Sequence, residues 1–185
     1  RTGSKVSLDA TGAHGGTTSA RIECTDGEQR GSYAFRPPVG PGPWLFEAWY
    51  RTDPMIADAK KGPVARLIAV DEEGEQCATF HAYGESTDGR WERLALSFDL
   101  PADARHVNLD LFNLFAPGIV WWDDVSLCFD VAEVQRREEH RRLEVERTTQ
   151  AAGIIDGLAD KVEQLPEVIT EDKLKKAVLR WAVED

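Results

Sequence analysis

Apolar and polar residues alternate with a period of two along much of the first two thirds of the chain. Between residues 44 and 51, one set of alternate positions is apolar or aromatic: Trp44, Phe46, Ala48 and Tyr50. The positions between them are more mixed: Leu45, Glu47, Trp49 and Arg51. The same period recurs at 94–98 and 107–111. Because successive side chains of a β-strand point to opposite faces, this pattern predicts strands with one buried face, as in antiparallel sheets.

Turn-forming residues separate these segments at short intervals. Examples are Gly-Gly at 15–16, Pro-Pro at 37–38, Asp-Gly at 88–89 and Pro-Gly at 117–118. The stretches left between such breakers have the length of strands. The region from residue 1 to about 130 is therefore predicted to be an all-β sandwich or barrel.

In the last predicted strand of this region, the alternation of apolar and polar residues is interrupted. Val120 and Trp122 share one face, but Leu127 joins that face only if the register shifts by one residue at the adjacent Asp123 and Asp124. A β-bulge at the two aspartates provides that shift. Two carboxylates at a bulge suit a hard cation with oxygen ligands, such as calcium. The alternative is an aspartate pair that caps turns and accepts hydrogen bonds from backbone amides.

The pattern changes after residue 130. Residues 131–147 are dense in Glu and Arg and lack an apolar stripe, which predicts a solvated helix acting as a spacer or stalk. Apolar residues then recur at spacings of three and four: Ala151, Ile154, Leu158, Val162 and Leu165. Pro166 ends this long helix, and a short helix is predicted from about Glu171. Residues 131–185 thus form a predicted helical extension, packed on itself, on the β domain or on another subunit.

Charge and composition exclude several partners. The formal net charge of −11 repels phosphates, so nucleic acid is excluded as a partner. No apolar run is long enough for a membrane span. The chain opens on Arg1 rather than Met, which predicts a piece of a larger protein. The three cysteines are far apart and predict buried free thiols in strands rather than one bridge and a leftover thiol.

Motifs for catalysis are lacking, which predicts that the chain is not an enzyme by itself. The four histidines show no H-E-x-x-H spacing, and the sequence contains neither a G-x-S-x-G elbow nor a glycine-rich phosphate loop. Asp123 and Asp124 are adjacent on one strand and make a poor acid–base pair for glycoside hydrolysis.

Aromatic rings alternate with polar side chains at positions predicted to face outward, as a saccharide-binding surface requires. The predicted sugar contacts are Glu47, Trp49, Arg51, Tyr83, Asp110, Phe112 and Trp121. A structural alternative has equal weight. In that interpretation Trp49 lies under a loop or against the helices, and Arg51 forms a buried ion pair with Glu47.

Three segments carry a family resemblance: His-Gly-Gly-Thr-Thr-Ser-Ala-Arg at 14–21, Pro-Trp-Leu-Phe-Glu-Ala-Trp-Tyr-Arg-Thr at 43–52, and Gly-Ile-Val-Trp-Trp-Asp-Asp-Val at 118–125. They resemble the galactose-binding-like jelly rolls. Within that group they are most similar to the non-catalytic carbohydrate-binding modules attached to bacterial glycoside hydrolases. The resemblance covers residues 1–130 and leaves out the helical extension.

The resemblance implies a jelly-roll β-sandwich that binds a polysaccharide or assists a neighbouring catalytic domain of an exported protein, in the periplasm or outside the cell. It also implies a structural calcium between an early loop and the last strand. Asp124 or Asp123 would supply a carboxylate, Asp9 would replace an acidic residue of the relatives, and carbonyls near residues 14–17 would complete the shell. The rival hypothesis is a structural or assembly module without a sugar ligand. Its helical extension would then be the protein–protein interface, including self-association.

Overall fold

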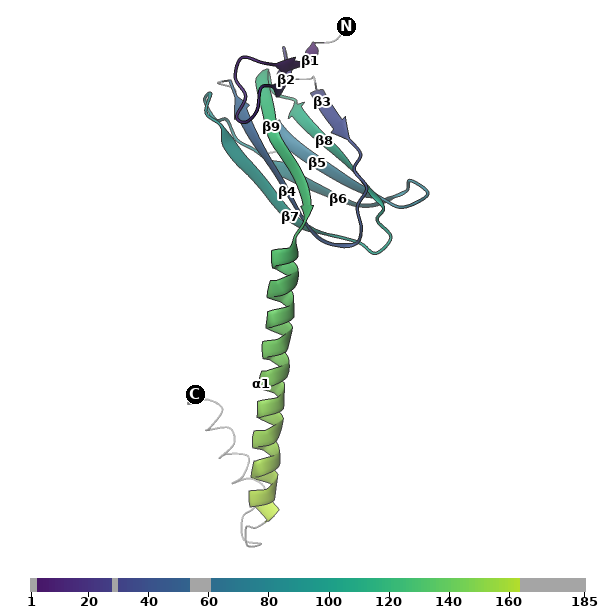
Figure 1. Ribbon diagram of the computed structural model, residues 1–185, viewed down its shortest axis with the longest axis vertical. Coiled ribbons are helices and arrows are strands. Elements are labelled where there is room, and N and C mark those ends of the chain that lie inside the picture. Colours follow the sequence, from purple (N-terminus) through teal and green to yellow (C-terminus); the bar gives the residue numbers. More distant parts are fainter. Residues whose placement is uncertain (1–2, 28–29, 54–60, 164–185) are drawn as a thin grey trace. The chain divides into compact units, whose positions relative to one another are not determined.

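The computed structural model describes residues 3–27, 30–53 and 61–163, which form nine strands and one helix (Figure 1). The strands are β1 (Ser4–Asp9), β2 (Ser19–Cys24), β3 (Arg30–Phe35), β4 (Gly42–Thr52), β5 (Gly62–Val70), β6 (Gln76–Tyr83), β7 (Glu92–Leu100), β8 (His106–Leu114) and β9 (Gly118–Phe129). The helix is α1 (Val131–Glu163).

The strands form two antiparallel sheets. The five-stranded sheet has the order β1-β2-β9-β4-β7, and the four-stranded sheet has the order β3-β8-β5-β6. The prediction of a mostly β sandwich followed by a helical extension is confirmed. Apart from the consecutive pairs β1–β2 and β5–β6, neighbouring strands are far apart in sequence, as β2 beside β9 shows, because the chain crosses repeatedly between the two layers.

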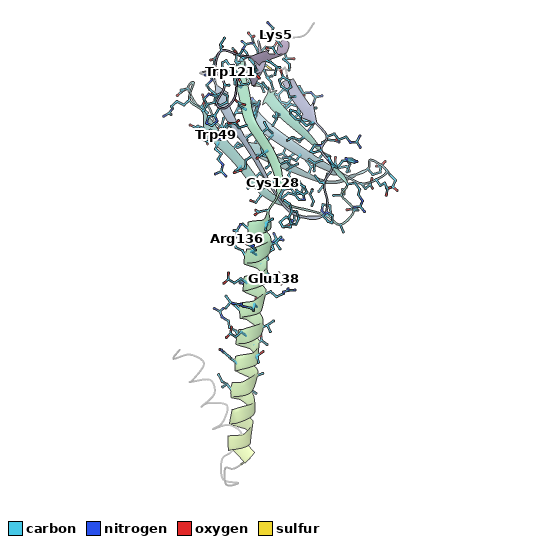
Figure 2. The ribbon with its side chains drawn as sticks, viewed as in Figure 1. Lys5, Trp49, Trp121, Cys128, Arg136 and Glu138 are labelled. Carbon is cyan, nitrogen blue, oxygen red and sulfur yellow. The ribbon has the colours of Figure 1, made fainter. Side chains whose placement is uncertain are left out.

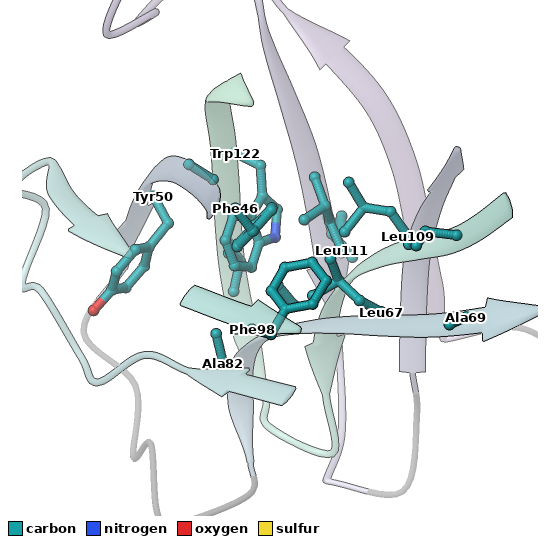
Figure 3. Packing of buried hydrophobic residues seen from close by; sticks show 14 of the residues in the cluster. Phe46, Tyr50, Leu67, Ala69, Ala82, Phe98, Leu109, Leu111 and Trp122 are labelled. Atoms are coloured by element: carbon teal, nitrogen blue, oxygen red, sulfur yellow. The ribbon is translucent and has the colours of Figure 1, made fainter. Parts of the chain in front are cut away.

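The core lies between the sheets, where the inner faces of both contribute apolar side chains. Phe46, Ala48 and Tyr50 of β4 are buried there, as the alternation predicts. On β9, Trp122 is buried and Leu127 packs against the same cluster, although the two are five residues apart. Figure 3 shows several of these side chains filling the space between the strands.

The odd spacing on β9 comes from the predicted bulge. Trp49 of β4 lies opposite Asp123, but Glu47, two residues earlier, lies opposite Ser126. Two residues of β9 therefore face one residue of β4. Asp124 is one of these two and has a φ of 45°, a left-handed conformation that aspartate tolerates better than most residues.

The helix follows β9 after one intervening residue, Asp130. The Asp130 carboxylate accepts the Glu133 backbone N–H at 2.9 Å, which caps the first turn of α1. The Asp130 backbone N–H donates to the Pro43 carbonyl oxygen at 2.9 Å, so the cap is fixed to the start of β4. The chain divides into two compact units between Val134 and Gln135.

The described part of α1 is consistent with the predicted solvated helix. Arg141 forms an ion pair with Glu138 at 3.0 Å, and no sustained apolar stripe is present in the first turns. Leu143, Val145 and Ile154 are exposed. The predicted turn at Pro166 and the short helix after it lie outside the described residues. No described helix is long and apolar enough to cross a membrane.

The cysteines are free thiols, as predicted, but the prediction that all three are buried is wrong. Cys24 is buried, Cys77 is half-buried and Cys128 is exposed. Cys128 lies on the part of β9 beyond the bulge, opposite Leu45 of β4.

Candidate functional site

The seven predicted sugar contacts lie on two opposite faces of the sandwich. Glu47, Trp49 and Arg51 of β4 and Trp121 of β9 lie on the outer face of the five-stranded sheet (Figure 2). The other three belong to the four-stranded sheet: Tyr83 on β6 and Asp110 and Phe112 on β8. A single sugar chain cannot contact both groups at once, so each face is described separately.

A loop between β1 and β2 covers Trp49. The His14 ring stacks on the Trp49 ring, with 4.0 Å between centroids and 14° between planes. It also meets the Trp91 ring edge-on at 5.7 Å. Trp49 therefore lies under a loop, which is the structural alternative that the sequence left open.

The aspartates of the bulge hold this loop in place. Asp123 Oδ2 accepts the backbone N–H groups of His14 at 2.7 Å and Gly15 at 3.2 Å, and its Oδ1 accepts the N–H of Asp124 at 2.8 Å. The imidazole of His14 donates through Nδ1 to Asp124 Oδ2 at 2.7 Å. The pair thus caps a turn and binds backbone amides.

Asp9 is engaged in the same way near Trp121. Its Oδ1 accepts the hydroxyl and the backbone N–H of Thr11 at 2.6 and 2.8 Å, and its Oδ2 accepts the indole N–H of Trp121 at 2.8 Å. Trp121 is only 8% exposed. The hydrogen bonds from Thr11, together with the one from Trp121, lower the pKa of the Asp9 carboxyl from 3.8 to about 2.

The lowered pKa of Asp9 gives a pH-dependent contribution to stability. An ionised Asp9 favours the folded state above its unfolded pKa of 3.8, and this contribution is lost as the pH falls towards about 2. We expect the free energy of unfolding of Asp9→Asn to fall less steeply than that of the unchanged protein between these two pH values. Urea titrations at several pH values test this, and parallel profiles would contradict it.

The carboxylates proposed for calcium do not fit that ion in this arrangement. Calcium takes six to eight oxygen ligands, whereas Asp9, Asp123 and Asp124 are each directed at N–H or O–H donors. The described residues contain no cluster of three or more His, Cys, Asp or Glu side chains that could hold a metal ion. We expect the same melting temperature with calcium chloride and with EDTA. A melting temperature that is higher in calcium chloride than in EDTA would instead support the predicted calcium site.

The predicted ion pair between Arg51 and Glu47 does not form. Glu47 pairs instead with Arg93 of β7. The Arg51 guanidinium carbon lies 4.4 Å from the centre of the Trp121 ring and 5.2 Å from the centre of the Trp91 ring. Arg51 is opposite Trp121 in the β4–β9 register, which explains the shorter of these contacts.

The outer face of the four-stranded sheet carries the other three predicted contacts. An ion pair lies at its centre, where Arg66 of β5 donates through Nη2 and Nε to Asp110 Oδ2 at 2.7 and 3.2 Å. The Arg66 guanidinium also lies over the Phe112 ring at 4.9 Å. Phe112 is only 5% exposed, so it supports the guanidinium and offers no free ring face of its own.

Tyr83 offers the exposed ring on this face. It is 43% exposed and stacks with His81 at 5.7 Å between centroids and 15° between planes. In the strand register His81 lies beside Arg66, which lies beside Asp110. An aromatic pair, a cation and an anion therefore form a continuous surface across three strands.

The sequence placed His81 beside Tyr83 as a candidate at the edge of a loop, but it did not identify Arg66, Trp91 or the His14 ring as members of these surfaces. The alternation of apolar and polar residues in β5 and β6 could have placed Arg66 and His81 on the outer face, because both occupy outward positions. The pairing of β5 with β6 and β8 supplies the rest, and no local pattern encodes which strands become neighbours.

No protein-family model matches the sequence, and no curated protein matches it. Many solved structures have a similar fold, and three of them illustrate it. One is the enzymatically active domain of tailspike protein 4 of bacteriophage CBA120, at 10% identity, with a TM-score of 0.53 over 67% of this chain and 17% of that chain. A second contains the CBM22-1 and GH10 modules of Clostridium thermocellum xylanase 10B in complex with xylohexaose, at 12% identity, with a TM-score of 0.51 over 70% of this chain and 25% of that chain.

The third is the family 30 carbohydrate-binding module of the cellulosomal cellulase Cel9D-Cel44B of Clostridium thermocellum. It is 12% identical, with a TM-score of 0.50 over 68% of this chain and 83% of that chain. The chain thus spans less than a third of the tailspike and xylanase chains but is comparable in length to the isolated module. The nine strands therefore adopt the jelly-roll β-sandwich fold found in carbohydrate-binding modules.

Proposed function

We propose that the sandwich is a non-catalytic module that binds a polysaccharide on the outer face of the four-stranded sheet. The observation that carries this proposal is the exposed Tyr83 ring, aligned with His81 and the Arg66–Asp110 pair on one open surface. The fold shared with carbohydrate-binding modules supports it.

The chemistry of this face suits a sugar. The electron-rich face of an aromatic ring attracts the weakly positive C–H groups on one side of a pyranose. Tyr83 provides such a face, and the phenol oxygen extends it with a hydrogen-bonding group. Arg66 and Asp110 offer donors and acceptors that are oriented by their mutual ion pair, at side-chain exposures of 34% and 16%. Sugar hydroxyls both donate and accept, so they bind to either partner.

The charge balance of this surface favours an uncharged polysaccharide. Asp110 is neutralised by Arg66 at 2.7 Å, so the centre of the face carries little net charge. We infer that the module serves a larger exported carbohydrate-active protein, extracellular or periplasmic, beside neighbouring domains.

Binding measured for the whole chain on a glycan array, followed by titration calorimetry with the best polysaccharide, tests this proposal. Tyr83→Ala removes the ring and is expected to weaken binding at least tenfold, whereas Tyr83→Phe keeps the ring and most of the affinity. Phe35→Ala removes an exposed aromatic ring from the edge strand β3 and is expected to leave affinity unchanged. A folded protein that binds no glycan, or a Tyr83→Ala variant that binds as well as the original, would refute the proposal.

The alternative function is an assembly module in which α1 forms the interface. Leu143, Val145, Ile154 and Ile155 are exposed on this helix, with Ile155 at 64%. Sedimentation equilibrium of the whole chain and of Ile155→Glu distinguishes the two functions. Self-association that Ile155→Glu abolishes, in a protein silent on the glycan array, would favour assembly.

A further inference from the structure

The search for a second interaction surface leads to β1, which forms one edge of the five-stranded sheet (Figure 1). Within the described part of the chain β1 pairs with β2 alone, so no strand lies on its other side. An edge strand presents a row of backbone N–H and C=O groups with which another strand can pair. The pairing of β1 with β2 determines which residues present those groups.

Val6 and Leu8 direct their backbone groups away from β2. The Thr25 N–H donates to the carbonyl oxygen of Gly3 at 2.9 Å, and these two residues lie opposite each other, so they form a hydrogen-bonded pair. Hydrogen-bonded and non-hydrogen-bonded pairs alternate along an antiparallel ladder. The odd-numbered residues of β1 therefore bond to β2, whereas Val6 and Leu8 point their N–H and C=O groups out of the sheet.

The side chains of Val6 and Leu8 are apolar and remain accessible at this edge. Val6 lies opposite Ile22, which is completely buried, so both side chains point to the core side of the sheet. A Cβ at Gly31 of β3 would stand 3.5 Å from a Val6 methyl carbon, so the other sheet reaches Val6 from below. Val6 and Leu8 are nevertheless 42% and 69% exposed. A strand added beside β1 would cover both.

The sequence of β1, Ser-Lys-Val-Ser-Leu-Asp, is complementary to itself in an antiparallel arrangement. With a two-fold axis at Ser7, Val6 of one copy lies opposite Leu8 of the other. Both residues direct their backbone groups outward, so they form a hydrogen-bonded pair, which the symmetry repeats. The same register sets Lys5 opposite Asp9 of the second copy, also twice, and opposite charges across two strands attract.

Other registers lack this complementarity. A shift of the pairing by one residue would set outward backbone groups of one copy opposite inward groups of the other. A shift by two residues, with the axis at Val6, would set Lys5 opposite Ser7 and lose both charge pairs. The pattern of charges therefore selects the register centred on Ser7.

Asp9 retains the capacity to bind Lys5 of a second copy. Its carboxylate accepts two hydrogen bonds from Thr11 and one from Trp121. A carboxylate has about four acceptor positions, so one stays available on Oδ2. Lys5 is exposed and lies on the same outer face of the sheet as Asp9, two pairs further along β1.

We propose that β1 is a dimerisation strand, through which two copies of this chain pair antiparallel about Ser7 and join their five-stranded sheets. The matched Lys5–Asp9 pairs favour a second copy over a strand of another protein. Both copies use the same surface, so association through β1 stops at two. The interface involves neither α1 nor Tyr83, which lies on the other sheet, so the proposal is independent of both proposed functions.

Sedimentation equilibrium of the whole chain at low salt, from micromolar to near-millimolar concentrations, tests the proposal. We expect a monomer–dimer equilibrium. Lys5→Glu sets like charges opposite each other twice and should raise the dissociation constant about tenfold or more. Arg90→Glu is the matched control, since it makes the same change of charge at an exposed arginine between β6 and β7. It should alter the dissociation constant less than about twofold.

Leu8→Pro tests the backbone pairing. Proline lacks the N–H that Leu8 directs outward, and edge strands tolerate proline where the N–H faces solvent. The variant should keep the circular dichroism of the unchanged protein and should stay monomeric where that protein dimerises. Leu8→Val keeps the N–H and an apolar side chain, so it should still dimerise.

An engineered disulfide tests the register, in chains that also carry Cys128→Ser to remove the exposed thiol. Two Ser7 residues would face each other as a non-hydrogen-bonded pair, with Cα atoms about 4.5 Å apart, which a disulfide can span. Ser7→Cys should therefore cross-link on mild oxidation. Ser4→Cys is the control, because the two Ser4 residues would lie about 20 Å apart along the strands. It should stay uncross-linked.

Four results would overturn the proposal. The first is a protein that stays monomeric throughout the concentration range, and the second is equal effects of Lys5→Glu and Arg90→Glu. The third is a dimer that survives Leu8→Pro but is abolished by Ile155→Glu, because the interface would then lie on α1. The fourth is equal cross-linking of Ser7→Cys and Ser4→Cys.

Discussion

Phe46→Ala is expected to lower the free energy of unfolding by roughly 3–5 kcal/mol, the largest stability change of any substitution considered for this protein. Phe46 is completely buried in β4, a strand that pairs with both β7 and β9. Removing the ring loses the favourable free energy of burying it away from water. It also leaves a cavity, which the two flanking strands prevent from collapsing. Urea unfolding followed by circular dichroism measures the change.

Phe46→Leu is the matched control for this prediction. It keeps the site apolar and most of its volume, so it should cost less than half as much as the alanine variant. The slope of unfolding free energy against urea should be the same in all three proteins, because each exposes a similar surface on unfolding. Equal midpoints for Phe46→Ala and the unchanged protein would show that Phe46 does not contribute to the core as described.

Asp123→Ala should have the second largest effect, a loss of about 2 kcal/mol, because hydrogen bonds to a charged acceptor contribute more than neutral ones. The carboxylate accepts three backbone N–H groups, from His14, Gly15 and Asp124. Without it the β1–β2 loop loses its attachment to β9, and the His14 ring is no longer held over Trp49. Hydrogen exchange at the amides of His14 and Gly15 should become faster, and tryptophan fluorescence should change.

Asp124→Asn separates this attachment from a general effect of charge at the bulge. Asparagine tolerates the left-handed conformation that Asp124 adopts, at a φ of 45°, and it removes one negative charge as Asp123→Ala does. The loss of stability should stay below about 1 kcal/mol, since only the contact with the His14 ring is weakened. Equal losses in the two variants would indicate that charge, rather than the backbone hydrogen bonds, is what Asp123 provides. Both measurements are made in EDTA so that bound cations play no part.

The sequence predicts those elements of the fold that depend on residues close together in the chain. The alternation around Phe46 and Tyr50 predicted which face of β4 is buried, and the broken period at Asp123 predicted the bulge. The charge-rich stretch after residue 130 predicted a helix without a core-facing stripe, and α1 begins at Val131. In each case the residue pattern and the backbone geometry are coupled within a few positions.

The candidate site was harder to predict from the sequence, because it depends on contacts between segments that are far apart in the chain. Trp49 and Tyr83 both occupy outward positions, yet they lie on opposite sides of the sandwich because β4 and β6 belong to different sheets. The covering of Trp49 by His14 depends on a loop 35 residues earlier in the chain, placed by hydrogen bonds to Asp123 and Asp124. The alternation of apolar and polar residues predicts that a side chain faces outward. It does not predict which other segment of the chain covers that side chain.

The single residue between β9 and α1 has a mechanical consequence. Tension applied to the C-terminal helix reaches β9 directly through Asp130, and β9 is hydrogen-bonded to β2 on one side and to β4 on the other. Next to the helix β9 is bonded to β4 alone, and its first half, Gly118–Trp122, is bonded to β2 as well. Pulling the whole strand out therefore requires two rows of hydrogen bonds to fail, whereas an edge strand such as β1 has only one. The sandwich is thus attached to α1 through an interior strand of its sheet, and such an attachment resists tension better than an edge strand would.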